Sequence, residues 1–213
     1  QGVPSGSEPA PVIPNSEMWY DYESNGVYTC AVDPGQGKVT RSVATMWRLD
    51  LDNFQRIRHE ATIAGLFDSI TFYPMVEAMC RHYNFPLLVP EANGHGAAFC
   101  ALARNYPKLY TRENIISGVA TKDIGWLTTG SPSHISSHGT KPYMMTELQA
   151  VLPLMETHDI NLVRELSQIR RKGGRVLILS SDDYHDSAAI MAATRHSATR
   201  TQNAFIGETG WKW

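Results

Sequence analysis

The sequence predicts one α/β domain with a central mixed sheet whose first three strands are antiparallel and whose faces carry helices. The β-branched and aromatic runs 27–32, 43–49 and 54–63 follow one another with only short turns between them, which favours a meander. The later apolar runs 87–89 and 176–179 alternate with helical patterns, as in sheets covered by helices. A length of 213 residues fits a single domain.

Two of the predicted strands end in a carboxylate. The run 27–32 (VYTCAV) leads into Asp33, Pro34 and Gly35, which form a turn signal. The short apolar run 87–89 is typical of a buried strand, and Glu91 follows it after one proline.

Helical spacing of apolar residues marks the rest of the chain. Pro74 suits the first turn of a helix that reaches Asn84, and Gly94 and Gly96 open a second helix through Ala103. We expect further helices over 144–154, over 161–170 with Gly173 and Gly174 ending it, and over 183–199. The stretch 128–140, rich in Ser, Gly and His, is expected to be a long mobile loop, and the Pro/Gly/Ser-rich segment 1–18 a linker or flexible arm before a domain over 19–213.

Composition excludes several classes of protein. With 42% hydrophobic and 19% charged residues, the chain is not disordered throughout, and it has neither an apolar run long enough for a membrane span nor a secretory signal. Cys30, Cys80 and Cys100 are too far apart for a disulfide framework or a cysteine zinc site, which fits a reducing cytoplasm. A net charge of -2 means that any DNA binding needs a local basic surface or metal ions. Because the chain begins with Gln, we expect it to be a piece of a longer protein.

Acidic residues gather at positions that a sheet can bring together: Asp33, Glu91 and the cluster Asp182, Asp183 and Asp186. The carboxyl ends of parallel neighbouring strands meet at one edge of an open sheet, so Asp33 and Glu91 converge if their strands are neighbours. Asp183 and Asp186 stand three residues apart and share one face of the last helix.

Such a cluster needs positive charge. Four or five carboxylates repel one another, and hard oxygen ligands are what Mg²⁺ and Mn²⁺ select. Two ions about 4 Å apart support hydrolysis of a phosphodiester, so the residue set indicates a two-metal nuclease. The alternative for each acid is a local role: Asp182 and Asp183 as helix caps, Asp33 as a turn former and Glu91 as a loop acid.

Four motifs resemble one family in order and spacing. They are AVDPGQGK (31–38), LLVPEANGHG (87–96), IGWLTT (124–129) followed by TKP (140–142), and SSDDYHDSAAIMAA (180–193). Together they resemble the C-terminal nuclease domain of the large terminase subunit of tailed bacteriophages, which has an RNase H-like fold. The resemblance covers most of the chain from Tyr28 onward, and it is the combination that is specific.

The resemblance implies roles for the acids. Asp33, Glu91 and Asp183 would be catalytic and would bind two Mg²⁺ or Mn²⁺ ions, with Asp186 and Asp182 as further metal ligands. The implied activity is an endonuclease of a viral genome-packaging motor that cuts concatemeric double-stranded DNA. The implied partners are DNA, the ATPase domain of the same large subunit, the small terminase subunit and the portal protein, with no membrane, in the cytoplasm of the infected bacterium.

The basic residues near these motifs are candidates for DNA binding, with a solvated side chain as the alternative for each: Lys38, Lys122, Lys141, Arg104 and Arg112. The segment around Gly35 and Gly37 is not a P-loop, because Val32 stands where the first glycine is needed. The family often has His before its Asp pair, where this chain has Ser181, and His185 is expected to be exposed on the helix.

Other functions remain open at this stage. A Holliday-junction resolvase or a transposase core uses the same kinds of acid on an RNase H-like fold. An actin-like or sugar-kinase-like nucleotide-binding domain is a further alternative, although the chain lacks a second glycine-rich phosphate loop. A docking module whose acids only solvate a surface is the third.

Overall fold

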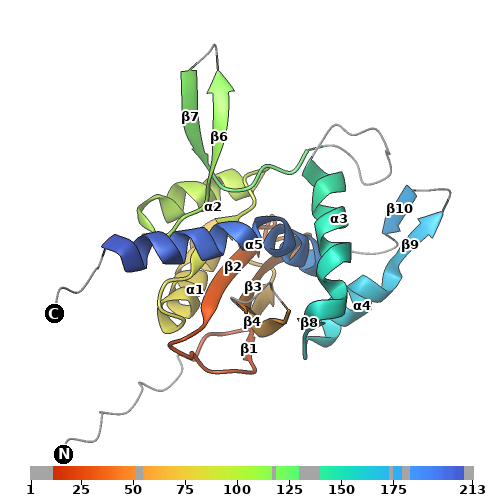
Figure 1. Cartoon of the computed structure of the whole chain (residues 1–213). Helices are drawn as coiled ribbons and strands as arrows, with labels where there is room; N and C mark the ends of the chain where they lie inside the picture. Colours follow the sequence, from red (N-terminus) through yellow and green to blue (C-terminus); the bar gives the residue numbers. More distant parts are fainter. Residues whose placement is uncertain are drawn as a thin grey trace, which may run out of the picture.

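The computed structural model describes residues 12–50, 55–116, 119–129, 140–172, 175–178 and 183–208. A sheet lies at the centre, with helices packed on both of its faces (Figure 1). This is the α/β class that the sequence predicts.

The predicted meander is confirmed. Strands β2 (Val27–Asp33), β3 (Ser42–Leu49) and β4 (Ile57–Gly65) pair in antiparallel fashion in sequence order. Strand β5 (Leu87–Pro90) lies parallel to β2 on its other side, so the sheet is mixed and has the order β1-β4-β3-β2-β5.

Two short strands extend the sheet beside β4. Strand β1 (Ser16–Met18) pairs with β4 in antiparallel fashion, and β8 (Met155–Glu156) pairs with it in parallel. The segment 1–18, for which an arm is expected, therefore includes an edge strand at its end.

Successive side chains of a strand point to opposite faces of the sheet, and a hydrophobic core lies on each face. Helices α1 (Ser69–His82) and α2 (Gly96–Leu102), with the 3-10 turn η1 (Ala103–Asn105), cover one face through residues such as Phe72 and Phe99. Helices α3 (Thr140–Val151), α4 (Ile160–Gln168) and α5 (Asp183–Glu208) cover the other face, and η2 (Leu152–Leu154) follows α3. Helix α5 runs across the sheet (Figure 1).

The start predicted for α1 is wrong. The helix begins at Ser69, because the side chain of Asp68 accepts a hydrogen bond from the backbone N–H of Thr71 at 2.8 Å and caps the first turn. Pro74 lies inside the helix rather than in its first turn.

Two hairpins stand apart from the sheet, and the sequence prediction missed one of them entirely. Strands β6 (Thr111–Ile116) and β7 (Val119–Ile124) form a hairpin that projects from the body (Figure 1). Strands β9 (Ile169–Lys172) and β10 (Arg175–Ile178) form the other. Helix α4 therefore ends at Gln168 instead of running on to the two glycines, and the predicted strand at 176–179 pairs with β9 rather than joining the central sheet.

Cys30, Cys80 and Cys100 are buried and free. Among the described residues, none of the helices combines the length and the hydropathy that crossing a membrane requires.

Candidate metal centre

Asp33 and Glu91 lie at neighbouring strand ends. The parallel register places Val32 opposite Pro90, and the backbone N–H of Glu91 donates to the carbonyl of Val32 at 2.8 Å. The next residue along β2 is Asp33, so the two acids meet at the carboxyl edge, as expected for parallel neighbours.

Neighbouring carboxyl groups at this edge affect the protonation of Asp33. Burial, the neighbouring Glu91 and then the charges of Asp186 and Asp183 raise the pKa of Asp33 well above its ordinary value. Asp33 and Glu91 are within hydrogen-bonding reach of each other, an arrangement that two carboxyl groups adopt when they share a proton. Four of the five predicted acids therefore gather here, and the fifth, Asp182, lies outside the described residues.

A buried chain of hydrogen bonds fixes helix α5 against the sheet. The indole N–H of Trp47 donates to Thr45 Oγ1 at 2.8 Å, and Thr45 Oγ1 lies 2.7 Å from Ser187 Oγ. Ser187 Oγ donates in turn to the carbonyl of Ala31 at 3.0 Å, so Thr45 must donate to Ser187. Because Ser187 follows Asp186 directly, this chain sets the position of the helix-borne acids relative to the end of β2.

Glu165 holds the start of the same helix, and the sequence analysis missed it. Its Oε2 accepts the backbone N–H groups of Tyr184 and His185 at 2.9 and 3.0 Å. Burial raises the pKa of Glu165 to about 7, although these hydrogen bonds favour its charged form. A carboxylate at a helix N-terminus is well placed in the helix dipole, so Glu165 orients the turn that carries Asp183 and Asp186.

Lys141 belongs to the acid cluster. Its Nζ lies 2.7 Å from Asp186 Oδ2, and both side chains are largely buried. Burial by itself raises the pKa of Asp186, but His185 and Lys141 outweigh burial and lower that pKa below its ordinary value. In this structure the predicted DNA contact of Lys141 is thus an ion pair within the site.

The expectation that His185 is exposed is wrong. The side chain is fully buried, and its Nε2 lies 3.1 Å from Asp186 Oδ1 without the geometry of a hydrogen bond. The cause is helix packing: His185 lies in a run of consecutive buried residues, from Tyr184 to Ala192, where α5 crosses the sheet.

The E-x-N-x-x-G motif builds the wall beside Glu91. A Cβ on Gly96 would come within 1.9 Å of the carbonyl oxygen of Glu91, so only glycine allows this approach. Asn93 holds the facing segment, since its amide donates to the carbonyl of Thr128 at 2.5 Å and its oxygen accepts the N–H of Thr128 at 2.8 Å. Trp126 lies beside the end of β5, where its backbone N–H donates to the carbonyl of Pro90.

Threonines close the segment that leads to Lys141. Thr129 N–H donates to Thr140 Oγ1 at 2.8 Å, and Thr140 N–H donates to Thr129 Oγ1 at 3.1 Å. The N–H of Lys141 then donates to the carbonyl of Thr129 at 3.0 Å. Residues 130–139, most of the predicted loop, lie outside the described residues.

The other basic candidates come from separate elements. Lys38 is exposed between β2 and β3, Arg104 is exposed in η1, and Lys122 is exposed on β7. Arg112 is turned inward, with its guanidinium donating to the carbonyls of Ile124 and Gly125. The structure therefore unites only Lys141 with the acids.

The acids offer the oxygen ligands that hard divalent cations prefer. As the side chains stand, no three acidic, histidine or cysteine groups among the described residues are close enough to hold an ion. Lys141 occupies one oxygen of Asp186, and Asp33 faces Glu91, which are the arrangements expected of carboxyl groups that compensate one another. Burial and then the charges of Glu91, Asp186 and Asp183 raise the pKa of Asp33, and positive charge at this edge would offset the repulsion between those charges.

Comparison with solved structures identifies the fold. The large terminase nuclease from thermophilic phage G20c matches with a TM-score of 0.55 and 18% identity, over 88% of this chain and 91% of that one. The same nuclease with bound zinc matches with a TM-score of 0.56 and 16% identity over the same shares. This chain has the fold of a phage large terminase nuclease. Its RNase H-like architecture is the one that the sequence motifs imply.

No family model and no curated protein matches this sequence. The terminase nuclease fold is thus recognised in the arrangement of the elements.

Proposed function

We propose that this chain is a metal-dependent DNA endonuclease of a phage genome-packaging motor. The observation that carries the proposal is the convergence of Asp33, Glu91, Asp183 and Asp186 at one sheet edge of a terminase nuclease fold. A structural role does not account for this cluster, because uncompensated buried carboxylates destabilise a folded protein.

Asp33, Glu91 and Asp183 would hold two divalent ions, with Asp186 and Asp182 as further ligands. Mg²⁺ or Mn²⁺ suits the all-oxygen donor set, and zinc in one of the similar structures supports a divalent ion. Ions held by these residues would supply activation of water and stabilisation of the charge that develops on a phosphodiester during hydrolysis.

Other residues of the chain hold the acids in position or would contact the DNA. The hydrogen-bond chain from Trp47 to Ala31 and the cap by Glu165 hold α5 so that its acids face β2. Lys141 neutralises Asp186 and is placed to attract a DNA phosphate once cations bind the carboxylates. The exposed Lys38, Lys122 and Arg104 would contact the DNA backbone.

The biological setting of the proposal is DNA packaging. Substrate would be concatemeric double-stranded DNA in the cytoplasm of an infected bacterium. The ATPase domain of the same large subunit, the small terminase subunit and the portal protein would be the partners, as in terminase motors.

Plasmid cleavage tests the proposal directly. Supercoiled plasmid is incubated with the wild-type chain in Mn²⁺, Mg²⁺ or EDTA, and with Asp33→Asn and Asp183→Asn in Mn²⁺. We expect nicking and linearisation that need the metal and that both substitutions abolish. Equal cleavage by the wild type and both variants contradicts the assigned site, and absence of cleavage with every metal contradicts nuclease activity of this chain.

A further inference from the structure

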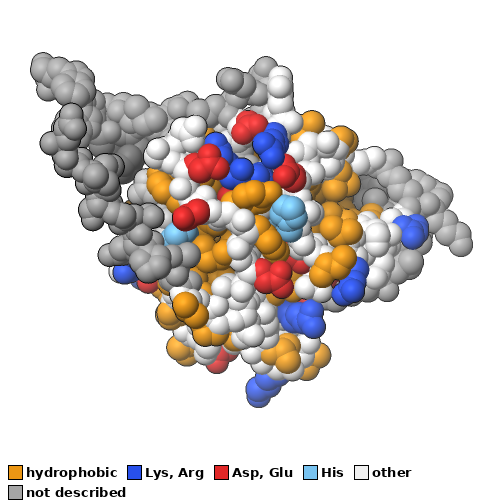
Figure 2. Space-filling model, turned by 90° about the horizontal axis from the view of Figure 1, so that it is seen from below, with side chains coloured by type: hydrophobic (Ala, Val, Ile, Leu, Met, Phe, Trp, Pro, Cys, Tyr) orange, Lys and Arg blue, Asp and Glu red, His pale blue; other side chains and the backbone are white. Residues whose placement is uncertain are grey.

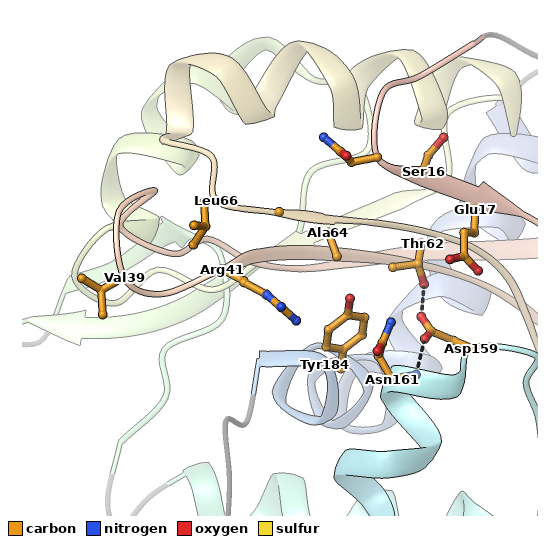
Figure 3. Close-up of a pocket in the computed structure, with 12 residues that line it drawn as sticks. Ser16, Glu17, Val39, Arg41, Thr62, Ala64, Leu66, Asp159, Asn161 and Tyr184 are labelled. Atoms are coloured by element: carbon orange, nitrogen blue, oxygen red, sulfur yellow. Dashed lines mark hydrogen bonds between the residues drawn. The ribbon is translucent and has the colours of Figure 1, made fainter.

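A pocket opens on the same face of the sheet as the acid cluster. It has a volume of about 670 Å³ and lies between the ends of β1 and β4, the start of α4 and the start of α5 (Figure 3). This volume is within the range of small-molecule sites, which is roughly 300 to 1,000 Å³.

The strand register places this pocket beside the acids. Val43 of β3 lies opposite Asp33, and Ala64 of β4, which lines the pocket, lies opposite Val43. Val43 and Ala64 both pack on the side of α5, and Asp33 shares that side because it is two residues beyond Ala31. Two strand spacings, about 10 Å, therefore separate Asp33 from the pocket floor.

Tyr184, in the first turn of α5, lies between the acid cluster and the pocket. It follows Asp183 directly, and it lines the pocket from the first turn of α5. A ligand in the pocket would thus lie next to the proposed metal centre, on the side away from Glu91.

The lining combines three kinds of chemistry. Arg41 reaches inward from the segment between β2 and β3, toward Tyr184 and Asn161, while Val39 and Leu66 stand at the outer end (Figure 3). Val39 and Leu66 are 82% and 55% exposed, so their apolar surface is open to a ligand at this end of the pocket. A guanidinium binds phosphate, amide and hydroxyl groups bind base edges, and apolar side chains cover the faces of a base.

A divalent cation suits this pocket less well. The carboxylate of Asp159 is already engaged, since Oδ2 accepts Thr62 at 2.8 Å and Oδ1 accepts the N–H groups of Asn161 and Leu162. Glu17 is the other acid of the lining, and it lies at the end of the pocket away from Val39 and Leu66 (Figure 3). A hydrophobic ligand is also disfavoured, because the interior of the pocket is polar.

We propose that this pocket is a nucleotide subsite that takes one nucleotide of the DNA strand beside the scissile phosphate. Arg41 holds its phosphate, Asn161 and the Tyr184 hydroxyl contact the base edge, and Val39 and Leu66 cover the base. The strand then enters the acid cluster in a fixed position. This inference rests on the proposed nuclease function, which it deepens by naming contacts to the substrate.

The first test measures binding without cleavage. Ligand-observed NMR with the four 2′-deoxynucleoside 5′-monophosphates, in EDTA, is carried out on wild type, Arg41→Ala, Ala64→Leu and Arg164→Ala. Ala64→Leu fills the pocket, and Arg164 is an exposed arginine of α4 that does not line it. We expect wild type and Arg164→Ala to bind, and Arg41→Ala and Ala64→Leu to bind at least about tenfold more weakly. Melting temperatures identify any variant that has failed to fold.

The second test uses the DNA strand itself. Mn²⁺-dependent plasmid cleavage is measured over a range of DNA concentrations for Arg41→Ala, Asn161→Ala and Arg164→Ala. A nucleotide subsite predicts that the first two raise KM for DNA by about tenfold relative to Arg164→Ala. Binding of free mononucleotides with unchanged KM for DNA would overturn the subsite as a DNA contact and leave a site for free nucleotides.

The two proposals fail in different ways. If wild type does not bind any mononucleotide at about 10 mM, the pocket proposal is overturned, whereas cleavage that depends on Asp33 still supports the nuclease. If mononucleotides bind and depend on Arg41 but no metal supports cleavage, the nuclease proposal is overturned, the DNA subsite is overturned with it, and a pocket for free nucleotides is left.

Discussion

The acidic side chains at the two ends of the central sheet have different neighbours: arginines at one end and other acids at the other. Near the start of β2, Glu23 pairs with Arg48 at 2.6 Å and with Arg58 at 2.8 Å, and Arg58 also pairs with the buried Glu60 at 2.7 Å. On the lower side of the molecule, acidic and basic side chains alternate in one cluster (Figure 2). At the end of β2, the charges of Glu91, Asp186 and Asp183 act on Asp33, and Lys141 is paired with Asp186.

This difference separates structural charge from functional charge. A network whose acids have arginine partners is complete within the protein, so it needs nothing from solution. A cluster in which carboxyl groups raise the pKa of Asp33 favours the arrival of cations. The contrast is open to experiment at both ends of the sheet.

The largest change in stability is expected at the ion-paired end. Arg58→Met keeps much of the side-chain volume but leaves Glu60 buried without its partner, so the free energy of unfolding should fall by about 3 kcal/mol. Urea denaturation measures it. Arg56→Met is the control, because Arg56 and Glu156 are both partly exposed, and its effect should stay below about 1 kcal/mol. Equal losses for the two variants would mean that burial of Glu60 does not distinguish these ion pairs.

A pH effect of similar size is expected from His59 on β4. Burial lowers its pKa to about 3, whereas the unfolded chain has a pKa near 6.5. The unfolded state therefore binds the extra proton between these values, and stability is lost as the pH falls. Between pH 7 and pH 4, the loss due to this group should be about 3 kcal/mol. Denaturation of wild type and His59→Gln at several pH values isolates it; parallel curves would show that His59 does not contribute.

At the acidic end, removing a charge should stabilise the protein. The folded-state pKa of Asp33 is raised, so its charged form is the unfavourable one at pH 7, and Asp33→Asn should raise the metal-free stability. The same variant should lose stabilisation by Mn²⁺. Thermal melts with and without Mn²⁺ measure both effects.

Glu23→Gln is the matched control at the other end. Arg58 and then Arg48 lower the pKa of Glu23, so removing that charge should lower stability and leave the response to Mn²⁺ intact. The same sign of change for Asp33→Asn and Glu23→Gln would remove the distinction between the two ends.

The smallest effect is expected at the cap of α5. Glu165→Ala removes the acceptor for two backbone N–H groups and should cost about 1 kcal/mol, while Glu165→Gln keeps an acceptor and should cost less. Urea denaturation and Mn²⁺-dependent cleavage are measured together. If Glu165 positions the start of α5, Glu165→Gln retains more cleavage activity than Glu165→Ala. Equal cleavage by the two variants contradicts this role.

The sequence predicts that the ends of two parallel strands carry Asp33 and Glu91 to one sheet edge, while the role of these residues stays a prediction. Asp33 and Glu91 are found because each follows a recognisable strand, and parallel strands bring their ends to one edge. Asp183 and Asp186 are found from helical spacing. These relations are local, or depend on one general rule of sheet topology.

The missed features depend on contacts between distant segments. Glu165 caps α5 across a gap of 19 residues, and His185 is buried because α5 crosses the sheet, so neither leaves a local pattern. The hairpin of β9 and β10 does leave a signal, because Gly173 and Gly174 separate the two strands and a pair of glycines is typical of a two-residue hairpin turn. Asp68, likewise, is a cap residue at the observed start of α1.

The paired threonines give the molecule a place to accept new sequence. Thr129 and Thr140 are bonded to each other, and Asn93 holds Thr128, so the position of Lys141 is set by anchors at the base of the intervening segment. Chain closure between fixed ends depends only weakly on length, about 0.6 kcal/mol for each doubling. A peptide tag or a reporter domain inserted between these anchors should therefore be carried without moving Lys141 away from Asp186, which makes this the natural point for labelling the protein.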